Sequence, residues 1–272
     1  MKSTASLVIL LSLGLAVCPP TSFAADRDAK RVEKFEALNG TGDPSQPLQT
    51  TVGLGTALSA LAQVTTAFDQ SGTGDVEYWM KTARDYGRAA QALGGALSRL
   101  GSSMEPGPVA AAVAGMGGQL VSVSYAGHGD VHYWMARVKS ICATVRGVGQ
   151  QMNTMAASCG ANGPTVRGGA VLQGLAIVAE SVDCGGNGDV EYWMKTTRSF
   201  CQIGHGVGRG VDLVAGSVPA PLDGVLRGLG AQFGGLSSAG TGSVQYWMAR
   251  ARGVSEQMSG LSNSLNQIAS SL

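Results

Sequence analysis

The chain repeats one seven-residue motif four times, and this repetition limits its possible folds more than any other feature. The motif is Gly-Asp-Val-x-Tyr-Trp-Met in three copies and Gly-Ser-Val-Gln-Tyr-Trp-Met in the last, and its tryptophans are Trp79, Trp134, Trp193 and Trp247. These are all the tryptophans of the chain, and they lie 55, 59 and 54 residues apart. Copies this similar within one chain indicate duplicated structural units.

Each motif is predicted to begin a long helix. The residue three places before each Tyr has a side-chain oxygen that suits a helix N-cap, and these residues are Asp75, Asp130, Asp189 and Ser243. Counted from each Trp, positions −3, 0, +4, +7, +11, +14, +18 and +21 are hydrophobic in every copy, except at Thr197 and Gly204. Spacing by four and three is typical of one helix face, whereas a strand would alternate. We therefore expect four helices of about 25 residues.

A nearly uncharged segment precedes each of these helices, at residues 47–68, 108–125, 164–182 and 221–236. Each segment opens on a proline, which suits the first turn of a helix. The connections are short, so neighbouring helices should run antiparallel. The sequence thus predicts an all-α fold of four tandem α-hairpin repeats, with eight helices forming a helical bundle or a short α-solenoid.

The four copies also form two similar pairs. Copies one and three share Asp-Val-Glu-Tyr-Trp-Met-Lys-Thr, in which the Glu77–Lys81 and Glu191–Lys195 spacing predicts helical ion pairs. Copies two and four share Tyr-Trp-Met-Ala-Arg instead. We therefore divide the body into a first pair of repeats, 47–160, and a second pair, 161–272, related by a pseudo-twofold axis or by a step along a solenoid.

The N-terminus has the pattern of an export signal. Lys2 precedes an uncharged apolar run at 7–17, and Ser22-Phe23-Ala24 matches a signal-peptidase site. The run of 11 residues is too short to span a bilayer of about 30 Å. We expect a signal peptide at 1–24, cleavage near Ala24, a charged extension at 25–46, and a secreted or periplasmic protein.

Two sets of repeated side chains are candidate site residues. The aromatic anchors are Tyr78, Trp79, Tyr133, Trp134, Tyr192, Trp193, Tyr246 and Trp247. We interpret the tryptophans as core, with a ligand platform as the alternative, and place the tyrosines farther outward as a contact surface. A basic residue follows each Trp by five positions, at Arg84, Lys139, Arg198 and Arg252. This set is either a solvated face or a surface for an anionic partner.

Cysteine and glycine patterns add two structural hypotheses. Cys142 and Cys201 each follow a motif Trp by eight residues, and an exported chain favours disulfides. We therefore predict a Cys142–Cys201 disulfide between adjacent second and third long helices, with two buried free thiols as the alternative. Gly204, Gly206, Gly208 and Gly210 alternate within the third long helix, as either a smooth face for close helix approach or a weak point.

Composition narrows the classes of function. Only 14% of residues are charged and the net charge is +1, so there is no basic footprint for nucleic acid. The chain has no P-loop, Gly-x-Ser-x-Gly, His-Glu-x-x-His or Cys-x-x-Cys motif, and we expect no catalytic, cofactor or metal site. The leading hypothesis is an exported, non-enzymatic helical-repeat protein that serves as a binding, scaffold or assembly module through a protein partner or self-association. The alternative is a membrane-active protein, or one that binds lipid or an apolar ligand, because 46–68 and 106–129 carry no charge.

Overall fold

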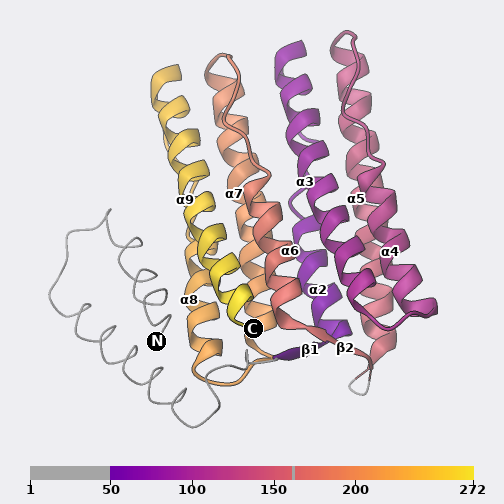
Figure 1. The fold of residues 1–272 in the computed structure, drawn as a ribbon. Helices are drawn as coiled ribbons and strands as arrows, with labels where there is room; N and C mark the ends of the chain where they lie inside the picture. The colour runs from indigo at the N-terminus through magenta and orange to yellow at the C-terminus, as the bar shows by residue number, and fades with distance from the viewer. Residues whose placement is uncertain (1–49, 161–162) are drawn as a thin grey trace, which may run out of the picture. The chain divides into compact units, whose positions relative to one another are not determined.

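The computed structural model describes residues 50–160 and 163–272, and the predicted signal peptide and charged extension lie outside these residues. Short helices alternate with long ones in this part of the chain (Figure 1). The short helices are α2 (Leu54–Thr65), α4 (Pro108–Val121), α6 (Gly168–Glu180) and α8 (Leu222–Gly234). The long helices are α3 (Val76–Ser103), α5 (Val131–Cys159), α7 (Val190–Ala215) and α9 (Val244–Ser271). The predicted all-α class is therefore correct.

The long helices begin where the motif predicts. In each copy the N-cap side chain accepts a hydrogen bond from the backbone N–H of the motif Tyr, at 2.8–3.4 Å. These bonds satisfy an amide that has no partner within the helix. The helices run for 26 to 29 residues, so each presents nearly four heptads to the core.

Two of the short helices start later than predicted. Residues at the start of 47–68 and 164–182 form strands β1 (Thr51–Gly53) and β2 (Thr165–Arg167), which pair antiparallel with Val52 opposite Val166. The first amide of each following helix then finds its acceptor across this ribbon. Leu54 N–H donates to the Pro164 carbonyl, and Gly168 N–H donates to the Thr50 carbonyl, both at 2.8 Å. The two halves thus cap each other's helices. If residues 51–53 and 165–167 were helical, as predicted, these two hydrogen bonds could not form.

The helices do not pair as the tandem-hairpin prediction expected. α2 packs on α5 and α7 and forms no extensive contact with α3, while α6 packs mainly on α9 and α3. After each short helix the chain runs on in extended form toward the far end of the molecule before the next long helix begins (Figure 1). These extended segments are long enough for each long helix to pack against helices other than the short helix that precedes it.

The packing repeats when the two halves, 50–160 and 163–272, are exchanged. α3 packs on α4 as α7 packs on α8, and α3 packs on α5 as α7 packs on α9. The contact between α6 and α7 is the one strong pairing without a counterpart. The halves are therefore related by a pseudo-twofold, and the β1–β2 ribbon is symmetric about Val52 and Val166. α2 and α6 lie at the centre, and each contacts long helices of both halves.

The alternating glycines of α7 allow close approach on two sides. A Cβ at Gly206 or Gly210 would lie 2.9 Å from Val64 Cα or 2.6 Å from the Ala60 carbonyl oxygen, both in α2. A Cβ at Gly208 would lie 2.8 Å from the Gly230 carbonyl oxygen in α8. Residues two apart on a helix point in nearly opposite directions, so the run serves two neighbours at once. The prediction of a smooth face for close helix approach is confirmed.

Gly210→Ala tests this close contact. The new methyl group meets backbone of α2, which cannot move without shifting the central helix, so we expect a loss of about 1–3 kcal/mol in the free energy of unfolding. Gly228→Ala in α8 is the control, because nothing lies within 4 Å of its Cβ position. Urea unfolding should show this control unchanged or more stable by up to about 1 kcal/mol. Equal effects of the two substitutions would contradict the assigned packing.

Candidate functional site

The repeated motif builds the same turn in all four copies. The two glycines before each N-cap lie under the ring of the motif Tyr. Gly72 has φ +132°, and a Cβ there would lie 2.1 Å from Tyr78 Oη, while one at Gly74 would lie 2.4 Å from the ring. The other three copies show the same geometry. Only glycine fits both the positive φ and the covered backbone, so the Gly-x-Gly pair and the Tyr form one structural unit.

The motif tryptophans are core residues in every copy. All four are 2–3% exposed, and each meets its preceding Tyr edge-on with ring centroids 5.0–5.3 Å apart. This burial agrees with the core interpretation and leaves no Trp face open to a ligand.

The motif tyrosines do not all lie outward as predicted. Tyr246 is 39% exposed and Tyr133 is half-buried, but Tyr78 and Tyr192 are each only 4% exposed. The buried pair belongs to α3 and α7, whose first turns face loops of the opposite half, whereas α5 and α9 lie at the edges of the molecule (Figure 1). The solvent exposure of each motif Tyr therefore depends on where its helix lies in the fold, which the motif itself does not encode.

Trp247→Ala and Tyr246→Ala compare the two roles at adjacent positions. The Trp substitution should lower the free energy of unfolding by about 3–5 kcal/mol, as expected for a buried aromatic side chain. The Tyr substitution should cost much less, because this ring is partly solvated. Thermal or chemical unfolding measures both, and similar small losses would show that Trp247 is not a core anchor.

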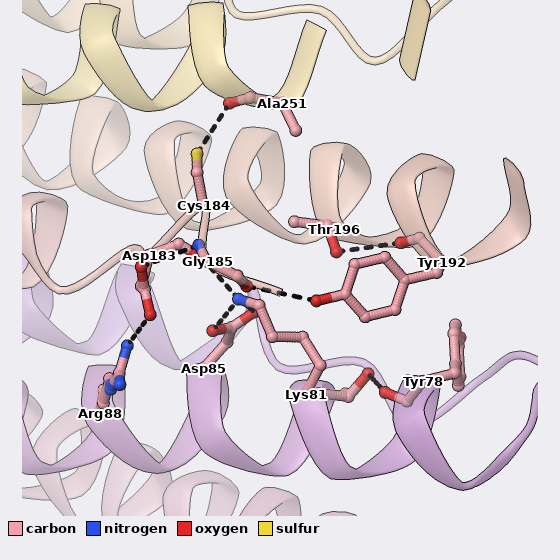
Figure 2. A network of polar contacts seen from close by, with 11 residues as sticks. Tyr78, Lys81, Asp85, Arg88, Asp183, Cys184, Gly185, Tyr192, Thr196 and Ala251 are labelled. Atoms are coloured by element: carbon pink, nitrogen blue, oxygen red, sulfur yellow. Dashed lines mark hydrogen bonds and ion pairs between the residues drawn. The ribbon is translucent and has the colours of Figure 1, made fainter. Parts of the chain in front are cut away.

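Buried charges cluster where the two halves meet, in the network of Figure 2. Lys81 Nζ donates to both carboxylate oxygens of Asp85, at 2.5 and 2.6 Å, and to the Asp183 carbonyl oxygen of the other half, at 2.5 Å. The predicted Glu77–Lys81 pair is therefore wrong. Lys81 turns inward instead, because the opposite loop and Asp85 offer it acceptors that replace water.

The second half makes the reciprocal contact. Lys195 Nζ donates to the Ser71 carbonyl oxygen at 2.9 Å and to Asp69 at 3.4 Å, so the predicted Glu191–Lys195 pair is also wrong. Glu191 accepts instead from Thr73 Oγ1 of the first half, at 2.9 Å. Each half thus has a buried lysine on its first long helix, and this lysine binds the loop that precedes the first long helix of the other half.

The two lysine sites balance their charge differently. Asp85 is paired with Lys81, and Arg88 pairs with Asp183 across the halves. Counted from the motif Trp, Ser199 and Gln202 stand in the second half where the first half has Asp85 and Arg88. One anion and one cation are therefore absent together, which keeps the local charge balanced.

A cleft of about 260 Å³ opens beside the Lys81 network. Its lining includes Glu77, Arg84 and Tyr192 together with the paired charges and the loop that begins at Gly185. Its lining contains no Ser, Cys or His. The buried charges in its lining, Lys81 and Asp85, already form an ion pair. Because Lys81 also binds the Asp183 carbonyl oxygen, the cleft lies at the junction between the two halves.

Burial and pairing shift the pKa values of this junction in opposite directions. Burial raises the pKa of Asp85 to about 6, although the Lys81 charge opposes the shift. The hydrogen bond from Arg88 lowers the pKa of Asp183 below its ordinary value. Burial lowers the pKa of Lys195, with Asp69 opposing. Asp85 is therefore the acid of this network whose ionisation the fold disfavours.

The four basic candidates lie on four different long helices. Arg84, Lys139, Arg198 and Arg252 are all exposed, on α3, α5, α7 and α9. α3 and α7 touch, but α5 and α9 lie at opposite edges of the molecule (Figure 1). A shared role of the four cations toward an anionic partner stays a prediction.

The predicted Cys142–Cys201 disulfide is wrong. Both thiols are free and buried, and burial raises the pKa of each to about 11. Cys142 lies on α5 and Cys201 on α7, and α2 packs against both of these helices. Equal register in the repeat therefore does not make the two helices neighbours. Cys159 and Cys184 are also free and half-buried, and Cys184 Sγ donates to the Ala251 carbonyl oxygen at 3.3 Å.

Among the described residues, no three His, Cys, Asp or Glu side chains are grouped so that they could hold a metal ion. No helix in the same residues is long and apolar enough to cross a membrane. No family model, curated protein or solved structure matches the chain.

Asp85→Asn tests the electrostatics of the junction. Folding raises the Asp85 pKa from 3.8 to about 6. The folded state therefore keeps a proton that the unfolded chain has released, and stability falls as the pH rises through this window. The free energy of unfolding of the wild type, relative to Asp85→Asn, should fall by about 3 kcal/mol between pH 3.5 and 6.5.

Ser199→Ala is the matched control, because Ser199 holds the Asp85 position in the other half and does not titrate in this range. Its difference from the wild type should be independent of pH. A pH-independent Asp85→Asn difference would show that Lys81 fully offsets the burial of the carboxylate.

Proposed function

We propose that this protein is an exported, non-enzymatic helical-repeat module that binds a protein partner at the edge formed by α4 and α5. The N-terminal sequence supports export, and the structural roles of the repeated residues support a scaffold. Gly, Tyr, Trp and the N-cap each serve the fold in the same way in four places. A catalytic site requires one asymmetric constellation, so a binding role fits this repetition better.

The uncharged outer face of α4 carries the proposal. Residues 106–129 contain no Asp, Glu, Lys or Arg, yet much of α4 is exposed, including Val109, Ala112 and Val121. The equivalent helix α8 carries Asp223 and Arg227. The fold therefore tolerates charge at this place, and its absence from α4 needs another reason. Depletion of charge is typical of the centre of a protein interface.

The missing charge of α2, and the nearly apolar sequence of α6, have a simpler cause. α2 and α6 are buried between long helices of both halves, so apolar residues there are core. The lipid-binding hypothesis rests on residues 46–68 and 106–129, and the burial of α2 explains the missing charge of the first segment. On α4, the exposed side chains are mostly small, whereas helices that insert into a membrane surface present large apolar residues.

Charge insertion at equivalent positions tests the docking edge. Ala112→Glu on α4 and Val225→Glu on α8 both alter exposed residues one place before a buried residue of their helix, Val113 or Leu226. The mature chain and both variants would be immobilised and exposed to the native exported fraction. We expect Ala112→Glu to lose at least about tenfold of the captured partner, because a buried unpaired carboxylate is costly. Val225→Glu should capture as the wild type does.

Melting curves establish that both variants are folded. Equal capture by the three proteins, or a loss confined to Val225→Glu, would contradict docking at the α4–α5 edge.

A further inference from the structure

The outer face of α5 carries two cations, Lys139 and Arg146, and no anion. His132, Lys139 and Arg146 are exposed and lie seven residues apart, so they follow one line along the helix. α5 contains no Asp or Glu over its whole length. Within the part of the chain that the structure describes, no carboxylate forms an ion pair with Lys139 or Arg146. His132 Nδ1 lies 4.0 Å from Asp130.

The pseudo-equivalent helix α9 shows that the fold does not require this pattern. The positions of His132, Lys139 and Arg146 correspond to Gln245, Arg252 and Ser259, counted from the motif Trp of each copy. Glu256 of α9 takes the place of Ala143 on α5. The outer face of α9 is therefore close to neutral, whereas that of α5 is positive.

The helix that carries Lys139 and Arg146 lies beside the uncharged helix α4. α4 packs on α5 as well as on α3, and both helices lie at the same edge of the molecule (Figure 1). This edge thus combines an apolar strip with cations and has no carboxylate on its two helices, whereas the opposite edge, α8 and α9, carries Asp223 and Glu256 beside its arginines. An apolar centre with a charged rim is the usual anatomy of a protein interface, in which the rim selects the partner by charge.

We infer that the partner docked at this edge is an acidic protein surface, whose carboxylates pair with Lys139 and Arg146 while its apolar residues cover α4. This inference rests on the proposed function and names the chemistry of its partner. The small exposed residues next to the cations along the helix, Ala136 and Ala143, allow close approach of another chain. They offer no large apolar side chain for insertion into an anionic membrane, which is the other source of matching negative charge.

Poly-L-glutamate is the probe for the acidic partner. Its binding to the mature chain would be measured by fluorescence anisotropy at 50 mM and 300 mM salt for the wild type and two double variants. Lys139→Ser/Arg146→Ser removes the α5 cations, and Arg227→Ser/Arg252→Ser removes two exposed cations from the opposite edge. We expect the α5 variant to bind about five- to tenfold more weakly at low salt. The control variant should stay within twofold of the wild type, and high salt should remove the difference.

Three results would overturn the inference: equal losses in both double variants, no binding by the wild type, or stronger α5-dependent binding to phosphatidylglycerol vesicles than to the polypeptide. The last result would assign the edge to an anionic membrane. Partner capture distinguishes this failure from that of the proposed function. If Ala112→Glu abolishes capture and Lys139→Ser/Arg146→Ser does not, docking at α4 stands and the acidic partner is rejected.

Discussion

The two halves share their central helices, and this sharing determines which long helices pack together. α2 belongs to the first half but packs on α7, and α6 belongs to the second but packs on α3. Neither half can bury its own central helix without the other. The β1–β2 ribbon, the crossed helix caps and the buried lysines all lie along this junction. The described chain from 50 onward therefore forms one compact unit, although its sequence repeats four times.

The pseudo-twofold provides an internal comparison for each residue. Features present in both halves, such as the Tyr-covered glycines and the buried Trp, are needed by the fold. Features present in one half need another explanation. The Asp85–Arg88 set is explained by its own charge balance, since both members are replaced together by Ser199 and Gln202. The charge pattern of α4 and α5 has no such structural balance, and for that reason it supports a binding role.

Local features could be predicted from the sequence, and long-range pairings could not. The N-caps, the long helices and the close approach at the α7 glycines follow from residue type and spacing within one segment. Connection length was a poor guide to packing, because the extended segments carry each long helix away from the short helix before it. The disulfide prediction is wrong for the same reason: equal register does not imply adjacency, because α2 packs against both α5 and α7. The Gly-x-Gly before each Tyr was the available signal for the covered turn, since such spacing often marks positive φ.

Native-state hydrogen exchange tests the interlocked core most directly. If both halves depend on the shared helices, the slowest amides of α5 and α9 open only in the same global event. They should then show equal free energies of opening and equal dependence on denaturant. Opening of α6–α9 at a clearly lower free energy than α2–α5, or the reverse, would show two independently stable halves and contradict this account.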